Sequence, residues 1–68
     1  MPERFGRNVF MARRRAGLAQ GELARLVSMQ QNDLSLLERG RRCPRLDTVV
    51  RLARGLGMPV ADLLRGIE

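Results

Sequence analysis

The sequence contains no histidine, and Cys43 is its only cysteine. A disulfide within the chain is therefore impossible, as is a zinc site that needs several cysteine or histidine ligands. We expect no metal, no other cofactor and no small-molecule ligand. Cys43 is either a redox-sensitive thiol that could bridge two subunits or a reduced bystander, and we favour the bystander.

Long hydrophobic runs are also missing. No stretch approaches the roughly 20 apolar residues that span a bilayer, and the first residues do not resemble a secretory signal. We therefore expect a cytoplasmic protein without a membrane partner. The sequence offers no carboxylate pair and no activated nucleophile, so we expect no enzymatic activity.

Acidic and aromatic residues are scarce. Seven acidic residues stand against thirteen basic ones, which gives a net charge of +6, and every basic residue is arginine. This charge favours a polyanionic partner. Arginine suits phosphate and guanine, but a GC-rich coding bias also explains the lack of lysine, and we give the bias more weight. Phe5 and Phe10 are the only aromatic residues, which favours packed helices over a sandwich or barrel.

Helical periodicity predicts five short helices in a single all-α domain that covers residues 1–68. We place the helices at residues 4–16, 20–27, 31–39, 46–56 and 60–65, with glycines ending the first, third and fourth. The residues that we expect to face the core are Phe5, Val9, Ala12 and Ala16; Leu23, Leu26 and Val27; Leu34 and Leu37; and Leu46, Val49, Val50, Ala53 and Leu56. Phe10 and Met11 lie beside the first stripe, and we expect them to fill in from its flank.

The second and third predicted helices are separated by a turn of three or four residues, which predicts a helix-turn-helix. If Leu34 faces the core, the outward side of the third helix carries Asn32, Ser35, Leu36 and Arg39, and Gln31 lies in its first turn. Amide side chains there could bind adenine through two hydrogen bonds, or could simply form a solvated polar face.

The segment GLAQGELARLVSMQQNDLSLLERGRRCPRLDTVVRLARGLGMPVADLL carries an ordered set of recognisable residues: Leu18, Gln20, Glu22-Leu23-Ala24, Leu34-Ser35, Leu37-Glu38-Arg39-Gly40, Pro44, Leu46, Leu52-Ala53, Leu56-Gly57 and Leu63-Leu64. In this set the chain resembles the lambda-repressor/Cro-like (Xre) helix-turn-helix family. The likeness covers about residues 5–64 once the first helix is included. It implies a five-helix, sequence-specific DNA-binding module, commonly dimeric, whose second motif helix enters the major groove.

This interpretation assigns DNA contacts to two sets of residues. The expected base contacts are Gln31, Asn32, Ser35 and Leu36. The expected backbone contacts are Gln20, Gln30, Arg39, Arg41, Arg42 and Arg45. Gln20 opens the second helix, where free N–H groups favour a phosphate. At least one loop arginine could instead be merely solvated. Leu36 either packs on a thymine methyl, which we favour slightly, or is an idle surface leucine. Asp33 could accept a hydrogen bond from cytosine, but we favour a stabilising interaction of its carboxylate with the positive N-terminal end of the helix.

Arg13 and Glu38 both fall on the apolar sides of their helices. An unpaired buried charge would cost several kcal/mol, so we expect these two residues to pair across the first and third helices. The resemblance implies the same pairing. A local pair between Glu38 and Arg42 is the alternative, and it would contribute only a few tenths of a kcal/mol.

The chain departs from the family at several positions. Serine or threonine is common where this chain has Ala19, Gln30, Arg45 and Pro59. Glycine is usual where it has Ser28, and a larger aliphatic residue where it has Ala12. Missing helix caps cost roughly 0.5–2 kcal/mol each, so we expect modest stability and support from a second subunit. We place a dimer contact among Met58, Val60, Leu64 and Ile67, with Ile67 and one of the first two as the strongest choices, and we place Leu63 in the core.

These observations predict a DNA-binding transcriptional regulator that binds a two-fold operator as a homodimer through the major groove. A repressor or an autoregulatory controller fits a chain of this size. The alternative is an antitoxin-type protein-interaction module, which binds a partner protein and binds DNA only for autoregulation.

Overall fold

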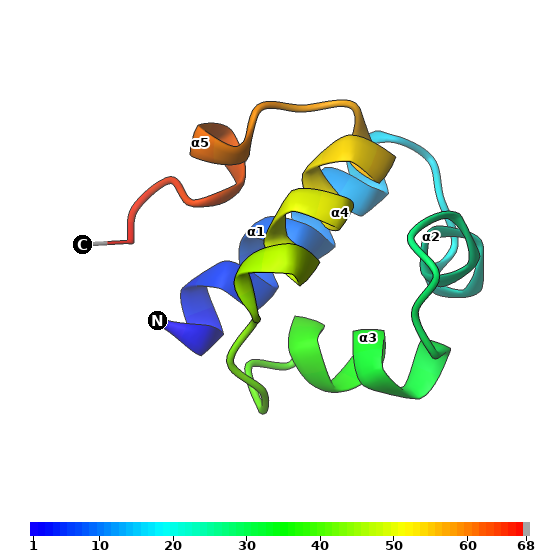
Figure 1. Cartoon of the computed structure of the whole chain (residues 1–68), viewed down its shortest axis with the longest axis horizontal. Helices are drawn as coiled ribbons and strands as arrows, with labels where there is room; N and C mark the ends of the chain where they lie inside the picture. The colour runs from blue at the N-terminus through cyan, green and yellow to red at the C-terminus, as the bar shows by residue number, and fades with distance from the viewer. Residues whose placement is uncertain (68) are drawn as a thin grey trace.

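The computed structural model describes residues 1–67, and this part of the chain contains five α-helices and no strand. The helices are α1 (Pro2–Arg15), α2 (Gln20–Leu26), α3 (Gln31–Glu38), α4 (Leu46–Leu56) and α5 (Val60–Leu63). Figure 1 shows α3 at one end of the molecule, α5 near the opposite end, and α1 and α4 between them. The predicted all-α, five-helix fold is confirmed. No described helix is both long and apolar enough to cross a membrane.

Five of the ten predicted helix boundaries were wrong by one or two residues, and the other five agree with the structure. α1 begins at Pro2, two residues before the predicted start at residue 4, because proline is tolerated in a first helical turn. In the first three helices the residue that was predicted to be last is instead the C-cap. α5 ends at Leu63 rather than at residue 65, whereas α4 has the predicted bounds.

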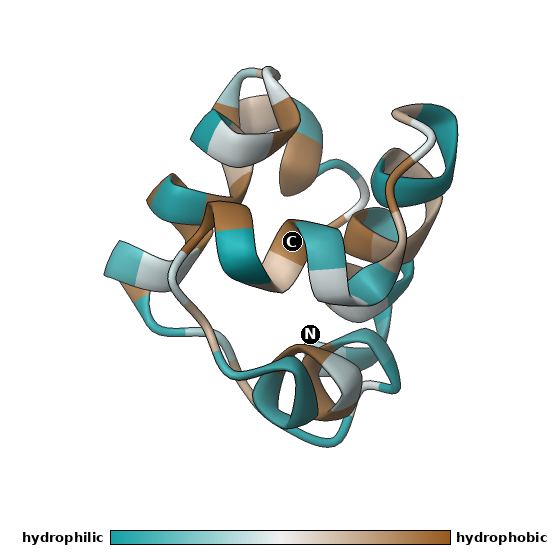
Figure 2. Cartoon of the chain, turned by 90° about the vertical axis from the view of Figure 1, so that its right-hand side faces the viewer, coloured by the Kyte–Doolittle hydropathy of each residue, from teal (hydrophilic) through white to brown (hydrophobic). Residues whose placement is uncertain are grey.

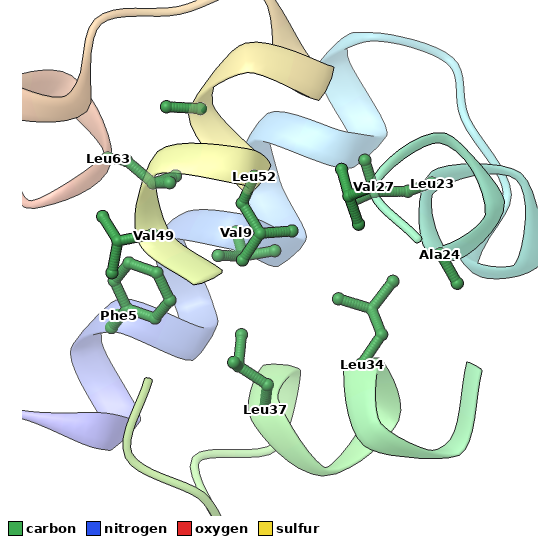
Figure 3. Close-up of a cluster of buried hydrophobic side chains, with 11 residues drawn as sticks. Phe5, Val9, Leu23, Ala24, Val27, Leu34, Leu37, Val49, Leu52 and Leu63 are labelled. Carbon is green, nitrogen blue, oxygen red and sulfur yellow. The ribbon is translucent and has the colours of Figure 1, made fainter. Parts of the chain in front are cut away.

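The core lies where all five helices meet. Its fully buried side chains, all labelled in Figure 3, are Phe5, Val9, Leu23, Leu34, Leu37, Leu52 and Leu63. Removing one such side chain from water contributes about 1.5–3 kcal/mol to folding. Figure 2 shows hydrophobic and hydrophilic residues alternating along the helices, as expected when one face of each helix packs inward.

Two leucines that were predicted to face the core are exposed, and one buried leucine was missed. Leu26 and Leu46 are 62% and 77% exposed, whereas Leu52 is fully buried. The buried face of α4 is centred on Val49, Leu52 and Ala53. α4 is thus rotated about its axis relative to the prediction, which turns Leu46 outward. Two other residues of the predicted face, Val50 and Leu56, are half-buried.

Two alanines of the apolar stripe that was predicted for α1 are not buried. Ala16 is exposed and Ala12 is half-buried. Phe10 and Met11 are 37% and 42% exposed, so they do not complete the core from the flank. The guanidinium groups of Arg13 and Arg14 lie 5.3 and 5.6 Å from the centre of the Phe10 ring. These cation–π contacts account for an aromatic ring at the surface.

Backbone-to-backbone contact between α1 and α3 fixes the position of α3. A Cβ atom at Gly6 would lie 2.3 Å from the carbonyl oxygen of Leu37, and one at Gly40 would lie 2.8 Å from Cα of Glu3. Only residues without a side chain allow this approach. Gly55 on α4 instead makes room for a side chain at the end of α2, because an added Cβ would lie 2.5 Å from Cγ1 of Val27.

The turn between α2 and α3 consists of residues 27–30. Ser28 has a φ of 58°, and it is the only non-glycine residue with positive φ in the described chain. Met29 N–H donates to the carbonyl of Ala24 (2.8 Å), and Ser28 N–H donates to that of Arg25 (3.3 Å). This is a Schellman ending, which usually contains glycine. The left-handed conformation costs a residue with a side chain roughly 1–2 kcal/mol.

None of the five helices has a side-chain hydrogen bond at its N-cap. α2 is partly compensated, because the backbone N–H of Ala19 donates to Oε1 of Glu22 at 2.7 Å. This is one half of a capping box; alanine lacks the oxygen that the other half requires. The expected weakness of the helix starts is therefore present in the structure.

Asn8 on α1 holds the segment that follows α5. Its Nδ2 donates to the carbonyl oxygens of Leu63 and Arg65, each at 2.9 Å. Both carbonyls lie past the regular hydrogen bonds of α5, and this amide satisfies them. These hydrogen bonds join α1 to the segment that follows α5, and Figure 1 shows the start of α1 and this segment on the same side of the molecule.

We predict that Gly6→Ala strongly destabilises the domain. The new methyl group would meet two backbone carbonyls, so α1 and α3 would have to separate. The expected loss in the free energy of unfolding is about 1–3 kcal/mol, despite alanine's better helix propensity. Urea unfolding measures it.

Gly21→Ala is the matched control. A Cβ atom there would lie 3.1 Å from the side-chain oxygen of Gln31, which can move. We expect no loss of stability in this variant. If Gly6→Ala were as stable as Gly21→Ala, close backbone contact would not determine the packing of α3.

Candidate nucleic-acid interface

The buried side of α3 fixes which residues the helix presents to solvent. Leu34 and Leu37 are buried in the core. Gln31, Asn32 and Arg39 are consequently exposed. Two further predicted contact residues, Ser35 and Leu36, are half-buried. The amide end of the helix is therefore its most accessible part.

The loop between α3 and α4 carries the arginines that were predicted to contact the DNA backbone. Arg41, Arg42 and Arg45 are all exposed. Arg42 folds back onto α3, where its Nη1 lies 3.2 Å from Oδ1 of Asp33. This contact places a loop arginine beside the first turns of α3 and occupies the carboxylate that would otherwise repel phosphates.

The remaining arginine contacts at this surface are weak. Nε of Arg45 lies 3.4 Å from Oδ1 of Asp47, with both side chains well exposed. Nε of Arg39 donates to the carbonyl of Ser35 at 3.4 Å. Arg41 makes no ion pair with any residue that the structure describes. Exposed pairs contribute at most about 1 kcal/mol, so these guanidinium groups can move to an anion at little cost.

Arg13 and Glu38 meet between α1 and α3. Nε of Arg13 lies 2.7 Å from Oε2 of Glu38, and Nη2 lies 3.1 Å from Oε1. Nη1 of Arg13 also donates to the carbonyl of Leu18 at 2.9 Å. The two side chains are 11% and 5% exposed. The alternative pair of Glu38 with Arg42 is absent, because Arg42 contacts Asp33 instead.

A hydrogen-bond chain connects this ion pair to the exposed end of α3. Nε2 of Gln20 donates to Oε1 of Glu38 at 3.1 Å. Nε2 of Gln31 donates in turn to Oε1 of Gln20 at 3.4 Å. Sequence reasoning did not identify this connection, since it involves four residues from three helices.

The side-chain chemistry determines which group donates and which accepts in each of these hydrogen bonds. Arginine can only donate and a carboxylate can only accept, so Gln20 must turn its NH₂ group toward Glu38. The oxygen of Gln20 is then left for Gln31, which must donate to it. Gln31 keeps one N–H and its carbonyl oxygen for a further partner. This 3.4 Å contact therefore favours one orientation of the Gln31 amide before any ligand arrives.

Comparison with known proteins identifies the family. The model of a family described as "Helix-turn-helix domain" matches residues 4–65 of this chain. The chain belongs to this helix-turn-helix family. It is 39% identical over 64 residues to an uncharacterized HTH-type transcriptional regulator, y4dJ, of Sinorhizobium fredii, and the match covers 94% of this chain and 83% of that one.

Solved helix-turn-helix structures are also similar. The restriction-modification controller protein C.AhdI from Aeromonas hydrophila is 30% identical with a TM-score of 0.87, over 90% of this chain and 92% of that one. The clp gene regulator ClgR from Corynebacterium glutamicum is 32% identical with a TM-score of 0.89, over 93% and 82%. The resemblance that the sequence showed to the lambda-repressor-like helix-turn-helix family is confirmed.

The residues predicted for a dimer contact lie apart from the helix-turn-helix motif. All four, Met58, Val60, Leu64 and Ile67, are half-buried and pack against the core. Leu63 is fully buried, as expected. Each of the four side chains therefore contributes to the monomer and still has a part of its surface exposed. Cys43 is exposed in the basic loop.

We predict that Glu38→Gln destabilises the domain by about 3–5 kcal/mol, because it leaves the buried guanidinium of Arg13 without a countercharge. Replacing both residues, as in Arg13→Met with Glu38→Leu, should restore much of this loss. Chemical unfolding of Glu38→Gln measures the loss, and unfolding of Arg13→Met, Glu38→Leu and the double variant measures the coupling of the two residues.

Asp62→Asn provides the control. It breaks the pair of Asp62 with Arg65, whose side chains are 44% and 75% exposed, and it should cost less than about 1 kcal/mol. Equal losses in Glu38→Gln and Asp62→Asn would show that the buried pair is no stronger than a surface pair.

Proposed function

We propose that this chain is a sequence-specific DNA-binding transcriptional regulator that inserts α3 into the major groove and binds a two-fold operator as a homodimer. One observation carries the proposal: the amide end of α3 is exposed beside a loop with three exposed arginines. The contact of Arg42 with Asp33 brings that loop and the start of α3 together. Base-reading groups thus stand next to backbone-binding groups, which is the arrangement that specific recognition requires.

The favoured orientation of the Gln31 amide supports adenine as one of the bases read. Adenine presents N6–H as a donor and N7 as an acceptor in the major groove, and a glutamine or asparagine side chain can match both. Gln31 retains one donor and one acceptor after donating to Gln20. Asn32 is exposed next to it and offers the same pair of groups. Leu36, which is half-buried, keeps only part of its surface for a thymine methyl.

Backbone binding is assigned to Gln20, Gln30, Arg39, Arg41, Arg42 and Arg45. α2 begins at Gln20, and its first N–H groups have no side-chain cap from Ala19. Unsatisfied N–H groups at a helix start favour a phosphate. The absent cap therefore leaves these donors available to DNA.

We assign the chain a role as an autoregulatory controller or repressor, and the descriptions of its relatives support this assignment. The chain covers 92% of C.AhdI, which is described as a restriction-modification controller protein. Two further similar proteins are described as transcriptional or gene regulators. A protein of this size can occupy DNA and block or recruit other factors.

We predict that Asn32→Ala and Gln31→Ala relax base preference, each costing about 1–3 kcal/mol on the best site. Arg41→Ala should instead weaken binding to all sequences alike and make the log–log salt dependence shallower by about 0.9 for each phosphate that is no longer neutralised. The measurement is fluorescence anisotropy on a duplex selected from a random library and on an unselected duplex, without added metal.

The two classes of substitution serve as controls for each other, since base-reading and backbone-binding residues should differ in their effect on selectivity. Equal losses of affinity on selected and unselected duplexes for Asn32→Ala would remove the base-reading assignment. Binding that is independent of salt, or absent at low salt, would remove the DNA-binding proposal itself.

The homodimer is proposed because one helix makes few base contacts. Non-specific binding has a Kd of about 10⁻⁴–10⁻⁶ M, whereas specific regulators reach about 10⁻⁸ M or lower. Two copies that bind half-sites about 34 Å apart supply the additional affinity that specific binding requires. The half-buried apolar residues at the end of the chain, especially Val60, Leu64 and Ile67, offer a surface for pairing.

We predict that wild-type protein sediments as a dimer at micromolar concentration and that Ile67→Asp sediments as a monomer. An aspartate there would bury a charge in the apolar contact. Ala61→Asp, at an exposed position of α5, is the matched control and should remain dimeric if the contact is centred on Ile67. A monomeric wild type that binds one half-site with full affinity would overturn the dimer.

A further inference from the structure

A basic groove runs between the outer side of α1 and the segment around α5. Its volume is about 350 Å³, and its walls include Arg4, Arg7, Arg15, Met11 and Met58. The three arginines and Met11 lie along one face of α1 at helical spacing. A neighbouring hollow shares Arg7 and Met11 with the groove, but its walls also include Phe10 and Glu38, so it reaches α3. We therefore use the name α1 groove only for the first hollow, between α1 and the segment around α5.

The α1 groove lies on the side of α1 opposite the recognition helix. Gly6 faces α3 through its contact with the carbonyl of Leu37. Asn8, two residues further, faces the other way and binds the carbonyls of Leu63 and Arg65. At 100° per residue these positions are about 200° apart around the helix. Figure 1 agrees, with α3 and α5 at opposite ends of the molecule. A ligand in the groove would leave α3 accessible.

The charge of the α1 groove is not neutralised within the described chain. Asp62 is the only acidic residue in the walls of the α1 groove, and its Oδ1 lies 2.9 Å from Nη2 of Arg65. Arg4 donates to the Arg65 carbonyl at 3.4 Å. Among the described residues, neither Arg7 nor Arg15 forms an ion pair. Several like charges line a concave surface and together attract an anionic partner.

The groove also contains apolar side chains that are not fully buried. Met11 is exposed, and Met58, which packs against the core on one side, is half-buried. Methionine adapts its flexible side chain to differently shaped apolar groups and is common on peptide-binding surfaces. An inorganic anion would use the arginines and leave these side chains uncovered. A ligand that satisfies the whole surface must be both acidic and partly apolar.

We propose that the α1 groove binds an acidic, amphipathic peptide segment of another protein. Its carboxylates would pair with Arg4, Arg7 and Arg15, since arginine binds carboxylates through two parallel hydrogen bonds. Its apolar side chains would cover Met11 and Met58. This function is separate from the proposed DNA binding and would let a DNA-bound molecule hold a second protein.

Two other occupants fit the surface less well. The backbone of a nucleic acid matches the charge but presents no apolar group to the methionines. A second copy of this chain would bring the same arginines against one another, and juxtaposed like charges oppose association. The acidic peptide alone matches both the charge and the apolar floor.

The test uses the full chain and a fluorescein-labelled synthetic peptide of glutamate, alanine and leucine, with leucine at every third or fourth position. A second peptide replaces each leucine with serine and keeps the charge. We expect saturable binding of the leucine peptide and at least about tenfold weaker binding of the serine peptide. Amide shifts in NMR spectra should centre on Asn8, Met11 and Asp62 and leave α3 unchanged.

Variants locate the binding. Met11→Ser, and Arg7→Ser with Arg15→Ser, should each weaken peptide binding by about tenfold, a change that corresponds to about 1.4 kcal/mol. The control pair, Arg51→Ser with Arg54→Ser, removes the same charge from exposed positions of α4 and should change binding less than about twofold. All these positions are exposed, so circular dichroism should show unchanged folding.

The proposal is overturned if the leucine peptide does not bind, if the serine peptide binds equally well, or if the control pair weakens binding as much as the groove variants. Duplex DNA that shifts the same α1 amides would assign the groove to nucleic acid. A change of sedimentation in Met11→Ser would assign it to a second copy. None of these measurements depends on operator binding, so failure here is distinct from failure of the DNA-binding proposal.

Discussion

The buried pair of Arg13 and Glu38 is the interaction on which the arrangement of the first three helices depends. Arg13 binds a carboxylate on α3 and the carbonyl of Leu18 just before α2. Glu38 binds Gln20 on α2 as well. A single charge pair therefore joins α1, the connection that follows it, α2 and α3. Since each partner would be costly to bury alone, the helices keep both together.

Close packing acts in the same direction as the ion pair. Gly6 and Gly40 let the backbone of α1 touch the end of α3, while Leu34 and Leu37 hold its inner face in the core. With its position and rotation determined in this way, α3 presents its amide end outward without any capping side chain. A side chain that must read a base benefits from such support, because it loses less freedom when it binds.

The fold and family could be predicted from sequence because helical periodicity, glycine stops and motif spacing are local features. The rotation of α4 could not, since two overlapping apolar stripes include Val49 and Ala53, and only packing chooses the one that buries Leu52 rather than Leu46. At the candidate site, exposure of Gln31 and Asn32 follows from the helical repeat once Leu34 is placed inward. The roles of Gly6 and Asn8 could not be predicted, because their partners are backbone carbonyls far away in the chain.

The contacts of Asn8 also bear on how the domain is made. Its amide binds the carbonyls of Leu63 and Arg65, which are separated from it by 55 and 57 positions. During synthesis α1 leaves the ribosome before α5, and Asn8 cannot form both bonds until residue 65 has followed. Native contacts over such separations require closing a long loop, which slows folding relative to local helix formation. A nascent chain would therefore form its helices early and its complete tertiary structure late. Translation must pass residue 65 before Asn8 can bind both carbonyls.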